Sequence, residues 1–239
     1  MKPASPQQMP ERNRMLQLLL RECPDLGAAL ERHAVVAGVE IHRQGEPIRD
    51  VHFPTRGVVS MIVRLRNGGM ADVLTIGNEG LVGLPAFLGL VKSTDTLIQQ
   101  APGELVRMPV EQFRTAVRRS EAWRRLLSSY TAYSLRVASQ TCVCNVHHSV
   151  QQRLCRWLLT SADRAGSNNL ALSQAMLAEM VGVRRQSVSE ELSELRANAT
   201  IEQRRNGILI LDRDRLEGYA CECYRETRAL YAELVEPLL

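Results

Sequence analysis

The stretch Gln174-Ala-Met-Leu-Ala-Glu-Met-Val-Gly-Val-Arg-Arg-Gln-Ser-Val-Ser-Glu-Glu-Leu-Ser-Glu194 decides how the C-terminal part of this 239-residue chain folds. Two helices joined by a short turn must pack closely where they meet. Ala178 supplies the small residue that this corner requires, and Gly182 supplies a turn residue that tolerates a left-handed backbone. Ser173 is placed to cap the first helix. The pattern therefore predicts a helix-turn-helix.

The second helix of this motif has a polar outward face. The inward face of the pair is apolar and consists of Leu177, Val181, Val183, Val188 and Leu192. The outward face then consists of Arg184, Arg185, Gln186, Ser189 and Glu190. Arginine can pair bidentately with guanine, glutamine can pair with adenine, and glutamate can accept from cytosine. Because the N-terminal end of the second helix is where this motif contacts bases, we expect these five residues to bind DNA.

A hairpin is expected directly after the two helices, over Thr200–Leu211, with its turn at Asn206–Gly207. Such a hairpin is typical of the wing of a winged helix. Arg204 and Arg205 lie near its tip and are candidate phosphate contacts. The alternative is an ordinary helical hairpin whose charged face is merely solvated, but the arginines, the wing and the cap together favour DNA binding.

Short apolar runs separated by turn residues fill residues 34–109. The turn residues are Gly45–Pro47, Asn67–Gly69 and Pro102–Gly103. Closely spaced short strands of this kind predict a small antiparallel sandwich or barrel. The Asn67–Gly68 pair suits a tight hairpin turn, because both residue types tolerate a positive φ.

Helical patterns flank the region of strands. We expect a helix over residues 13–32 that is broken at Cys23–Pro24. An amphipathic helix is expected over residues 146–165, followed by a loop at Gly166–Asn169, and a further helix over roughly 213–235.

Helix is expected from about residue 110 to 145, and within 120–145 a partly apolar seam runs along a long helix. Its members follow alternating four- and three-residue steps: Trp123, Leu127, Tyr130, Ser134, Val137, Thr141 and Cys144. This spacing is typical of a coiled-coil contact, so the six residues from Leu127 onward are the expected dimerisation surface. The alternative is that this side of the helix lies on the barrel of its own chain.

Composition and charge exclude several classes of protein. Hydrophobic residues make up 45% of the chain and charged residues 23%, as in soluble globular proteins. No stretch approaches the roughly 18 apolar residues that span a bilayer, and the polar N-terminal segment lacks a signal-peptide core, so we expect a cytoplasmic protein without membrane contact. The net charge is +4, but residues 147–239 hold 12 Lys and Arg against 13 Asp and Glu. Attraction to DNA must therefore come from local arginine clusters.

Six cysteines in a chain of this size do not form a disulfide framework and are expected as thiols. Two close pairs resemble metal or redox pairs: Cys142 with Cys144, and Cys221 with Cys223. Residues two apart on a helix point about 200° apart, so we expect structural roles for both pairs and no metal. His147 and His148 are expected to be capping or solvated. A thiol- or metal-based redox sensor is the alternative function.

No catalytic arrangement stands out. We find no nucleophile–base pattern, and Gly77-x-x-Gly80-x-x-Gly83 lacks the strand–turn–helix context of a dinucleotide site. We therefore expect a protein that is not an enzyme and that carries no cofactor.

Across nearly its whole length the chain resembles the CRP/FNR superfamily of bacterial transcription regulators. The resemblance is carried by Ile41–Pro47, Gly77–Gly83, Asn145–Leu159 and Val181–Val188. It implies an α+β fold: a cyclic-nucleotide-binding-type antiparallel β-barrel, a long dimerisation helix and a C-terminal winged helix-turn-helix. It also implies a homodimer on a two-fold-symmetric, double-stranded DNA operator. RNA polymerase and a small-molecule effector of unknown identity are further candidate partners.

The resemblance divides the chain into a barrel (1–115), a dimerisation helix (116–146) and a DNA-binding domain (147–239). By position, Arg185, Gln186 and either Ser189 or Glu190 fall where members of this family read bases. Glu190 replaces an arginine that is common there, which leaves the operator sequence open.

Two departures from the family pattern concern the effector. Members that bind cyclic AMP carry a Gly-Glu-Leu pattern and then an Arg-Ser pair, and the corresponding stretch Leu84–Thr96 has neither. Without a guanidinium a buried phosphate lacks a bidentate partner, so we do not expect cyclic AMP as effector. The Lys92–Thr94 segment, with Ser93, is either an anion site or an exposed loop. Oxygen-sensing members hold an iron–sulfur centre with an N-terminal cysteine cluster. This chain offers only Cys23 there, so we do not expect an iron–sulfur centre. The effector site is unknown, and a barrel that serves only as a scaffold is the rival interpretation.

Overall fold

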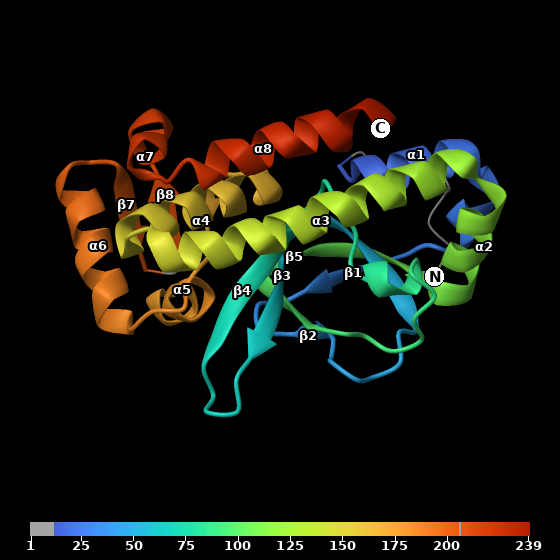
Figure 1. Cartoon of the computed structure of the whole chain (residues 1–239), viewed down its shortest axis with the longest axis horizontal. Coiled ribbons are helices and arrows are strands. Elements are labelled where there is room, and N and C mark those ends of the chain that lie inside the picture. Colours follow the sequence, from blue (N-terminus) through green and yellow to red (C-terminus); the bar gives the residue numbers. More distant parts are fainter. Residues whose placement is uncertain (1–11, 206) are drawn as a thin grey trace, which may run out of the picture.

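Two long strands organise the N-terminal part of the protein. The strands, in chain order, are β1 (Glu31–Val35), β2 (Glu40–His42), β3 (Asp50–Arg64), β4 (Met70–Ile76) and β5 (Thr96–Pro109). All pairs are antiparallel; the order is β1-β5-β3-β4, and β2 also pairs with β5. This computed structural model describes residues 12–205 and 207–239, so the expectations for the N-terminal segment before Arg12 and for Asn206 in the wing turn lie outside the described residues. Figure 1 shows the arrangement.

Some of the expected short strands are segments of longer ones. The apolar runs at 51–54 and 57–65 join in β3, and those at 96–100 and 104–109 join in β5. Register shifts between β3 and β5 allow the strands to change direction without ending. The antiparallel fold class is confirmed, but within the described residues the hydrogen-bonded path does not close into a ring. The expected barrel is therefore an open sheet.

The turn between β3 and β4 forms at the expected residues. Gly68 adopts a φ of 88°, and its N–H donates to the carbonyl oxygen of Leu65 at 3.0 Å. Asn67 does not have a positive φ; its side chain instead accepts from the N–H of Gly69 at 3.1 Å. Glycine thus occupies the left-handed position that an L-residue would adopt only with strain.

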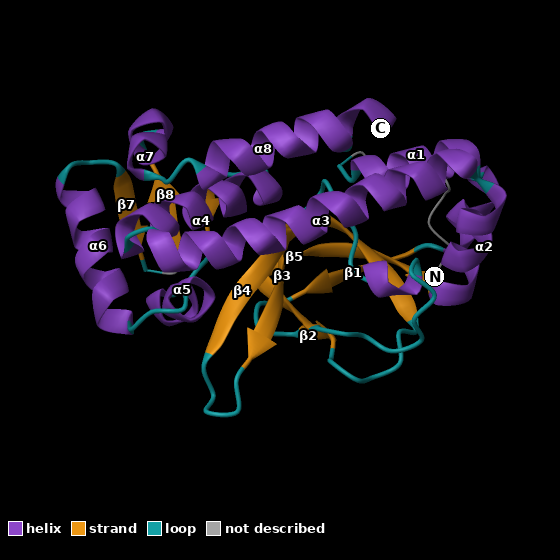
Figure 2. Ribbon diagram, viewed as in Figure 1, coloured by secondary structure: helices purple, strands orange, loops and turns teal. Residues whose placement is uncertain are grey.

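Helices lie against this sheet and lead away from it (Figure 2). The first helices of the described residues are α1 (Arg14–Glu22) and a 3-10 helix (Pro24–Ala29), with the expected break at Cys23–Pro24. After β5, α2 (Val110–Arg119) leads into the long α3 (Glu121–His147). Among the helices of the described residues, none is both long and apolar enough to cross a membrane.

The C-terminal part is a second, smaller α/β unit. Its helices are α4 (Val150–Ala165), α5 (Gln174–Val181), α6 (Arg185–Ala197) and α7 (Arg213–Tyr219), and its strands are β6 (Asn169–Leu170), β7 (Ile201–Arg204) and β8 (Gly207–Ile210), in the sheet order β6-β8-β7. The last expected helix is two helices, α7 and α8 (Cys223–Leu234), followed by a 3-10 turn (Glu236–Leu238). Figure 1 shows α8 running back along α3 towards the N-terminal part, and the two helices are in contact.

The seam expected to mediate dimerisation faces the core of its own chain, so that prediction was wrong. Its six residues are at most 9% exposed: Leu127, Tyr130, Ser134, Val137, Thr141 and Cys144. Leu127 and Tyr130 pack in the same hydrophobic core as Phe53 and Leu81 of the N-terminal part. Alternating three- and four-residue steps identify one face of a helix but do not say what covers it. Here the sheet and neighbouring helices of the same chain cover it.

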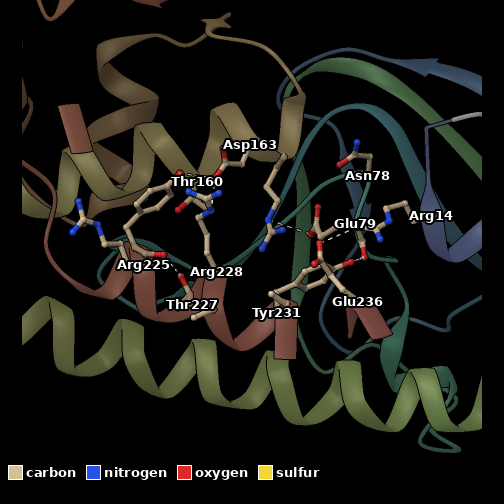
Figure 3. Close-up of a pocket in the computed structure, with 14 residues that line it drawn as sticks. Arg14, Asn78, Glu79, Thr160, Asp163, Arg225, Thr227, Arg228, Tyr231 and Glu236 are labelled. Carbon is tan, nitrogen blue, oxygen red and sulfur yellow. Dashed lines mark hydrogen bonds and ion pairs between the residues drawn. The ribbon is translucent and has the colours of Figure 1, made fainter. Parts of the chain in front are cut away.

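A buried ion pair joins the two parts of the protein. Arg164, in the last turn of α4, places Nε 3.3 Å from Oε1 of Glu79, in the loop after β4. The carboxylate of Glu79 also accepts from the N–H of Gly77 at 3.0 Å. Arg164 donates to the hydroxyl of Tyr133 on α3 at 2.6 Å, and Tyr231 of α8 donates to the carbonyl oxygen of Glu79 at 2.9 Å. Figure 3 shows Glu79 and Tyr231 side by side in this joint.

Two glycines allow the backbone of this loop to approach its neighbours. A Cβ on Gly77 would lie 2.5 Å from the carbonyl oxygen of Arg164, and a Cβ on Gly80 would lie 2.1 Å from the hydroxyl of Tyr130. Both distances are shorter than van der Waals contact permits. Gly77 therefore allows the loop to pack closely on α4 of the C-terminal part, and Gly80 allows it to pack closely on α3.

We expect Arg164→Met to lower the free energy of unfolding by about 3–5 kcal/mol, because Glu79 would remain buried without its cation. Urea denaturation followed by circular dichroism measures this change. The control is Arg14→Met, which removes the half-exposed pair between Arg14 and Glu236 and should cost about 0–1 kcal/mol. Equal, small losses for both variants would contradict the importance of the buried pair.

Candidate nucleic-acid interface

The corner between α5 and α6 forms from the residues expected to build it. Ser173 caps α5, because its Oγ accepts from the N–H of Met176 at 3.1 Å. Gly182 ends the helix with a φ of 70°, and the N–H of Val183 then donates to the carbonyl oxygen of Ala178 at 2.9 Å. This pattern satisfies carbonyl groups that the end of a helix leaves free. The predicted helix-turn-helix is confirmed.

The inward face of both helices is buried as expected. Val183 is half-buried, and the other members are at most 5% exposed: Leu177, Ala178, Val181, Val188 and Leu192. They share one hydrophobic core with Leu154, Trp157 and Leu158 of α4. The core holds α6 in a fixed position, and α4 in turn is fixed to the sheet by the joint at Arg164.

The outward face of α6 is open to solvent. All five residues expected to contact DNA are exposed: Arg184, Arg185, Gln186, Ser189 and Glu190. Within the described part of the chain, no carboxylate forms an ion pair with Arg184 or Arg185. Gln186 donates from Nε2 to Oε1 of Glu190 at 3.0 Å, so these two side chains hold each other one helical turn apart. The two guanidinium groups are available to an anionic partner at the N-terminal end of α6, where the helix dipole also favours negative charge.

The hairpin of β7 and β8 forms the predicted wing beside α6. Arg204 and Arg205 are both exposed. Arg204 donates from Nε to Oε1 of Glu202 at 3.1 Å, whereas Arg205 has no ion-pair partner among the described residues. Since exposed ion pairs are weak, Arg204 can exchange Glu202 for a phosphate at little cost. Both arginines can therefore reach a phosphate backbone.

The structure also shows a contact that the sequence did not indicate. Strand β4 packs against α5, and a Cβ on Gly182 would lie 3.6 Å from Cβ of Ala71. A cavity of about 740 Å³ opens beside this contact and is lined by Val63, Leu65, Met70, Val183 and Arg185, among others. The turn of the helix-turn-helix therefore touches the hairpin of the N-terminal sheet. Chain segments 110 residues apart meet here, and no local pattern encodes that.

The segment that could have held an anion is a loop whose hydroxyl groups are already bonded. Ser93 donates to the carbonyl oxygen of Asp95 at 2.8 Å, and Thr94 donates to the carboxylate of Asp95 at 2.6 Å. Lys92 is exposed. The carboxylate of Asp95 would oppose an anion at this place, which favours the loop interpretation.

Four sulfur and imidazole side chains come together at the end of α3, a grouping that the sequence did not indicate. They are Cys144, His148, Cys221 and Cys223. Cys142 is exposed and Cys144 buried, as expected for residues two apart on a helix. The same assumption was wrong for Cys221, because it lies in the link between α7 and α8 and not on a helix with Cys223.

Comparison with known proteins agrees with this geometry. Residues 152–219, which contain both helices and the wing, match the family of Crp-like helix-turn-helix domains. Residues 152–219 therefore form a Crp-like helix-turn-helix domain. No curated protein matches the chain in sequence.

Solved structures show that the rest of the chain has the fold of CRP/FNR regulators. FixK2 from Bradyrhizobium japonicum superposes with a TM-score of 0.69 and 18% identity, covering 80% of this chain and 98% of that one. A CRP/FNR-family transcriptional regulator from Eubacterium rectale gives 0.64 and 16%, covering 83% and 93%. The c-di-GMP-responsive global regulator CLP of Xanthomonas campestris gives 0.59 and 19%, covering 77% and 94%. The Crp-like domain lies within a chain that has this fold.

The left-handed backbone at Gly182 makes that position sensitive to substitution. We expect Gly182→Ala to lower the free energy of unfolding by roughly 1–2 kcal/mol, because a Cβ is strained at this φ although its nearest neighbour, Cβ of Ala71 at 3.6 Å, leaves room for it. The control is Gly218→Ala in α7, where φ is ordinary and the space is open; it should raise stability by about 0.5–1 kcal/mol. Urea denaturation of both variants checks the opposite signs, and a change of the same sign and size would contradict the account of the corner.

Proposed function

We propose that the protein is a sequence-specific regulator that binds a palindromic DNA operator as a homodimer in the cytoplasm. The observation that carries the proposal is the pair Arg184 and Arg185, exposed and without ion-pair partners among the described residues, at the start of a helix held by a buried core. A rigid helix lets its side chains meet base edges at fixed positions, which is what sequence-specific binding requires.

Residues in the first turns of α6 would contact the base edges. Arg185 is the first helical residue, and its fork of donors fits the major-groove edge of guanine. Gln186 and Glu190, already bonded to each other, together offer a donor and an acceptor to neighbouring bases. Arg204 and Arg205 on the wing would contact phosphates and so set the position of the protein without specifying sequence.

We further propose that dimerisation uses the solvent-facing side of α3, opposite the buried seam. Large apolar side chains are exposed there: Leu135 at 69%, Val143 at 52% and Val146 at 77%. Leu135, Ser139, Cys142 and Val146 follow four- and three-residue steps, the spacing that two packed helices require. A second copy would cover these groups and place two α6 helices in successive major grooves, about 34 Å apart.

An effector in the N-terminal part would act on α6 through the contacts between the parts of the chain. They include the joint of Glu79 with Arg164, the hydrogen bond from Trp157 to Asp72, and the packing of β4 on α5. Regulation requires only that the effector bind one arrangement of these contacts more tightly than another.

We expect Arg185→Ala to weaken binding to the specific operator by about 1–3 kcal/mol and to affect nonspecific DNA less, because a base contact is lost. Fluorescence anisotropy titrations with operator and scrambled duplexes at one fixed salt concentration measure both affinities.

Two control variants separate base reading from simple charge. Arg205→Ala should weaken binding to operator and scrambled DNA about equally, since it removes a phosphate contact. Arg196→Ala, an exposed arginine in the last turn of the same helix, should change neither affinity appreciably. Equal losses on both duplexes for Arg185→Ala would refute its role in base reading.

We expect Leu135→Glu to convert the protein from dimer to monomer, because a carboxylate would be buried in the proposed interface. Light scattering coupled to size-exclusion chromatography measures the mass in solution. Arg125→Glu, exposed on another side of the same helix, should leave the dimer intact. A wild-type protein that is already monomeric at the concentrations that bind DNA would exclude this interface, and so would a Leu135→Glu variant that remains dimeric.

A further inference from the structure

A compact group of metal-ligating side chains lies where α3 ends and α8 begins. Cys144 is in the last turn of α3, and His148 is the residue at which that helix ends. Cys221 lies in the link after α7, and Cys223 is the first residue of α8. The ligand atoms of all four lie within 4.8 Å of one another. The three cysteines are buried, and they form a cluster apart from the two large hydrophobic cores.

We propose that Cys144, His148, Cys221 and Cys223 form a tetrahedral site for one divalent metal ion of the Zn²⁺ type. Three thiolates and one imidazole are a donor set that Zn²⁺ prefers in closed, structural sites. Two of the spacings already suit this geometry. The sulfur atoms of Cys144 and Cys221 are 3.5 Å apart, and Sγ of Cys223 is 3.6 Å from Nδ1 of His148. With ordinary zinc–ligand distances, a tetrahedron has edges of about 3.8 Å between sulfurs and about 3.6 Å between sulfur and nitrogen.

Neighbouring residues orient the ligands as the surroundings of a metal site should. Nε2 of His148 lies 3.1 Å from Oε1 of Glu222, while Nδ1 faces the sulfur of Cys223. A carboxylate on the far ring nitrogen is the usual way in which a ligating histidine is held in one tautomer. Gln140 donates from Nε2 to Sγ of Cys223 at 3.0 Å, a bond that stabilises a thiolate.

The charge of the surroundings also suits thiolate ligands. The pKa of Cys144 is lowered to about 5, first by the hydrogen bond from the Cys221 thiol, with Arg156 and His148 acting in the same direction. Burial raises the pKa of Cys223, and the hydrogen bond that Cys221 donates to Cys144 raises the pKa of Cys221. Binding the metal would therefore release the protons of these two thiols to solvent. The complex of three thiolates, neutral His148 and a divalent ion carries a charge of −1, which Arg156 offsets.

The close approach of four ligating side chains favours a metal site over a disulfide. A disulfide between Cys144 and Cys221 would use two of the groups and leave Cys223 and His148 without a role. A metal ion uses all four and ties the end of α3 to the start of α8. It would thus link the C-terminal part of the chain to α3.

The metal content of the untagged full-length protein tests the proposal directly. The protein is purified in reductant, stripped with a chelator, incubated with excess ZnCl₂, desalted and measured by plasma mass spectrometry. We expect one zinc per chain, and a higher melting temperature for the zinc-loaded than for the stripped protein. Loading with Co²⁺ in place of zinc should give the visible absorption of tetrahedral thiolate coordination.

Two matched pairs of variants assign the ligands. Cys144→Ser should lose bound zinc, whereas Cys142→Ser, two residues earlier and exposed, should keep one per chain. His148→Ala should lose or weaken binding and alter the Co²⁺ spectrum, whereas His147→Ala should match the wild type. Circular dichroism checks that each variant is folded, and the wild-type Co²⁺ spectrum decides the donor set if a variant is not.

Three results would overturn the proposal. Stripped wild-type protein that takes up neither Zn²⁺ nor Co²⁺ would exclude the site. Equal loss of zinc from Cys142→Ser and Cys144→Ser would place the metal elsewhere. A disulfide between Cys144 and Cys221, found by mass spectrometry in protein that holds no metal, would assign the cluster to thiol chemistry instead.

Discussion

A buried contact between charges links the C-terminal helices, α6 among them, to the N-terminal sheet. Arg164 belongs to α4, on which α5 and α6 pack, whereas Glu79 belongs to a loop of the N-terminal sheet. Each charge is expensive to bury alone, and each is acceptable only in the presence of the other and of its hydrogen-bond partners. Since α3 supplies Tyr133 and α8 supplies Tyr231 to the same place, the pair fixes how four elements meet.

This joint is one of several places where the C-terminal helices contact the N-terminal sheet. The joint lies at the C-terminal end of α4, and another contact, between β4 and the turn at Gly182, lies next to the start of α6. Trp157 of α4 also donates from Nε1 to the buried carboxylate of Asp72 in β4 at 3.1 Å. The C-terminal helices are therefore held against the sheet at several separated points.

The helix-turn-helix could be predicted from the sequence because its determinants are local. Ala178, Gly182 and the apolar positions around them lie within about twenty residues and act on one corner. The long strands and the joint could not be predicted in the same way, since β3 and β5 pair across 34 to 59 residues and Glu79 meets Arg164 across 85. The prediction of the dimerisation surface was wrong for a related reason. The spacing of the seam residues identifies one face of a helix, and only the tertiary structure shows that α3 turns this face towards its own chain. The cysteine cluster could not be predicted from the sequence either, because its members come together only when α8 packs against α3.

The central claim is that two copies of α6 read a symmetric DNA site, and selection from a random duplex library tests it most directly. Repeated rounds of binding by the purified wild-type protein, followed by sequencing, give the preferred site without a known target gene. The account predicts an inverted repeat whose half-sites are about 10–10.5 base pairs apart, centre to centre. Enrichment of no motif, or of a single unrepeated element, would contradict it.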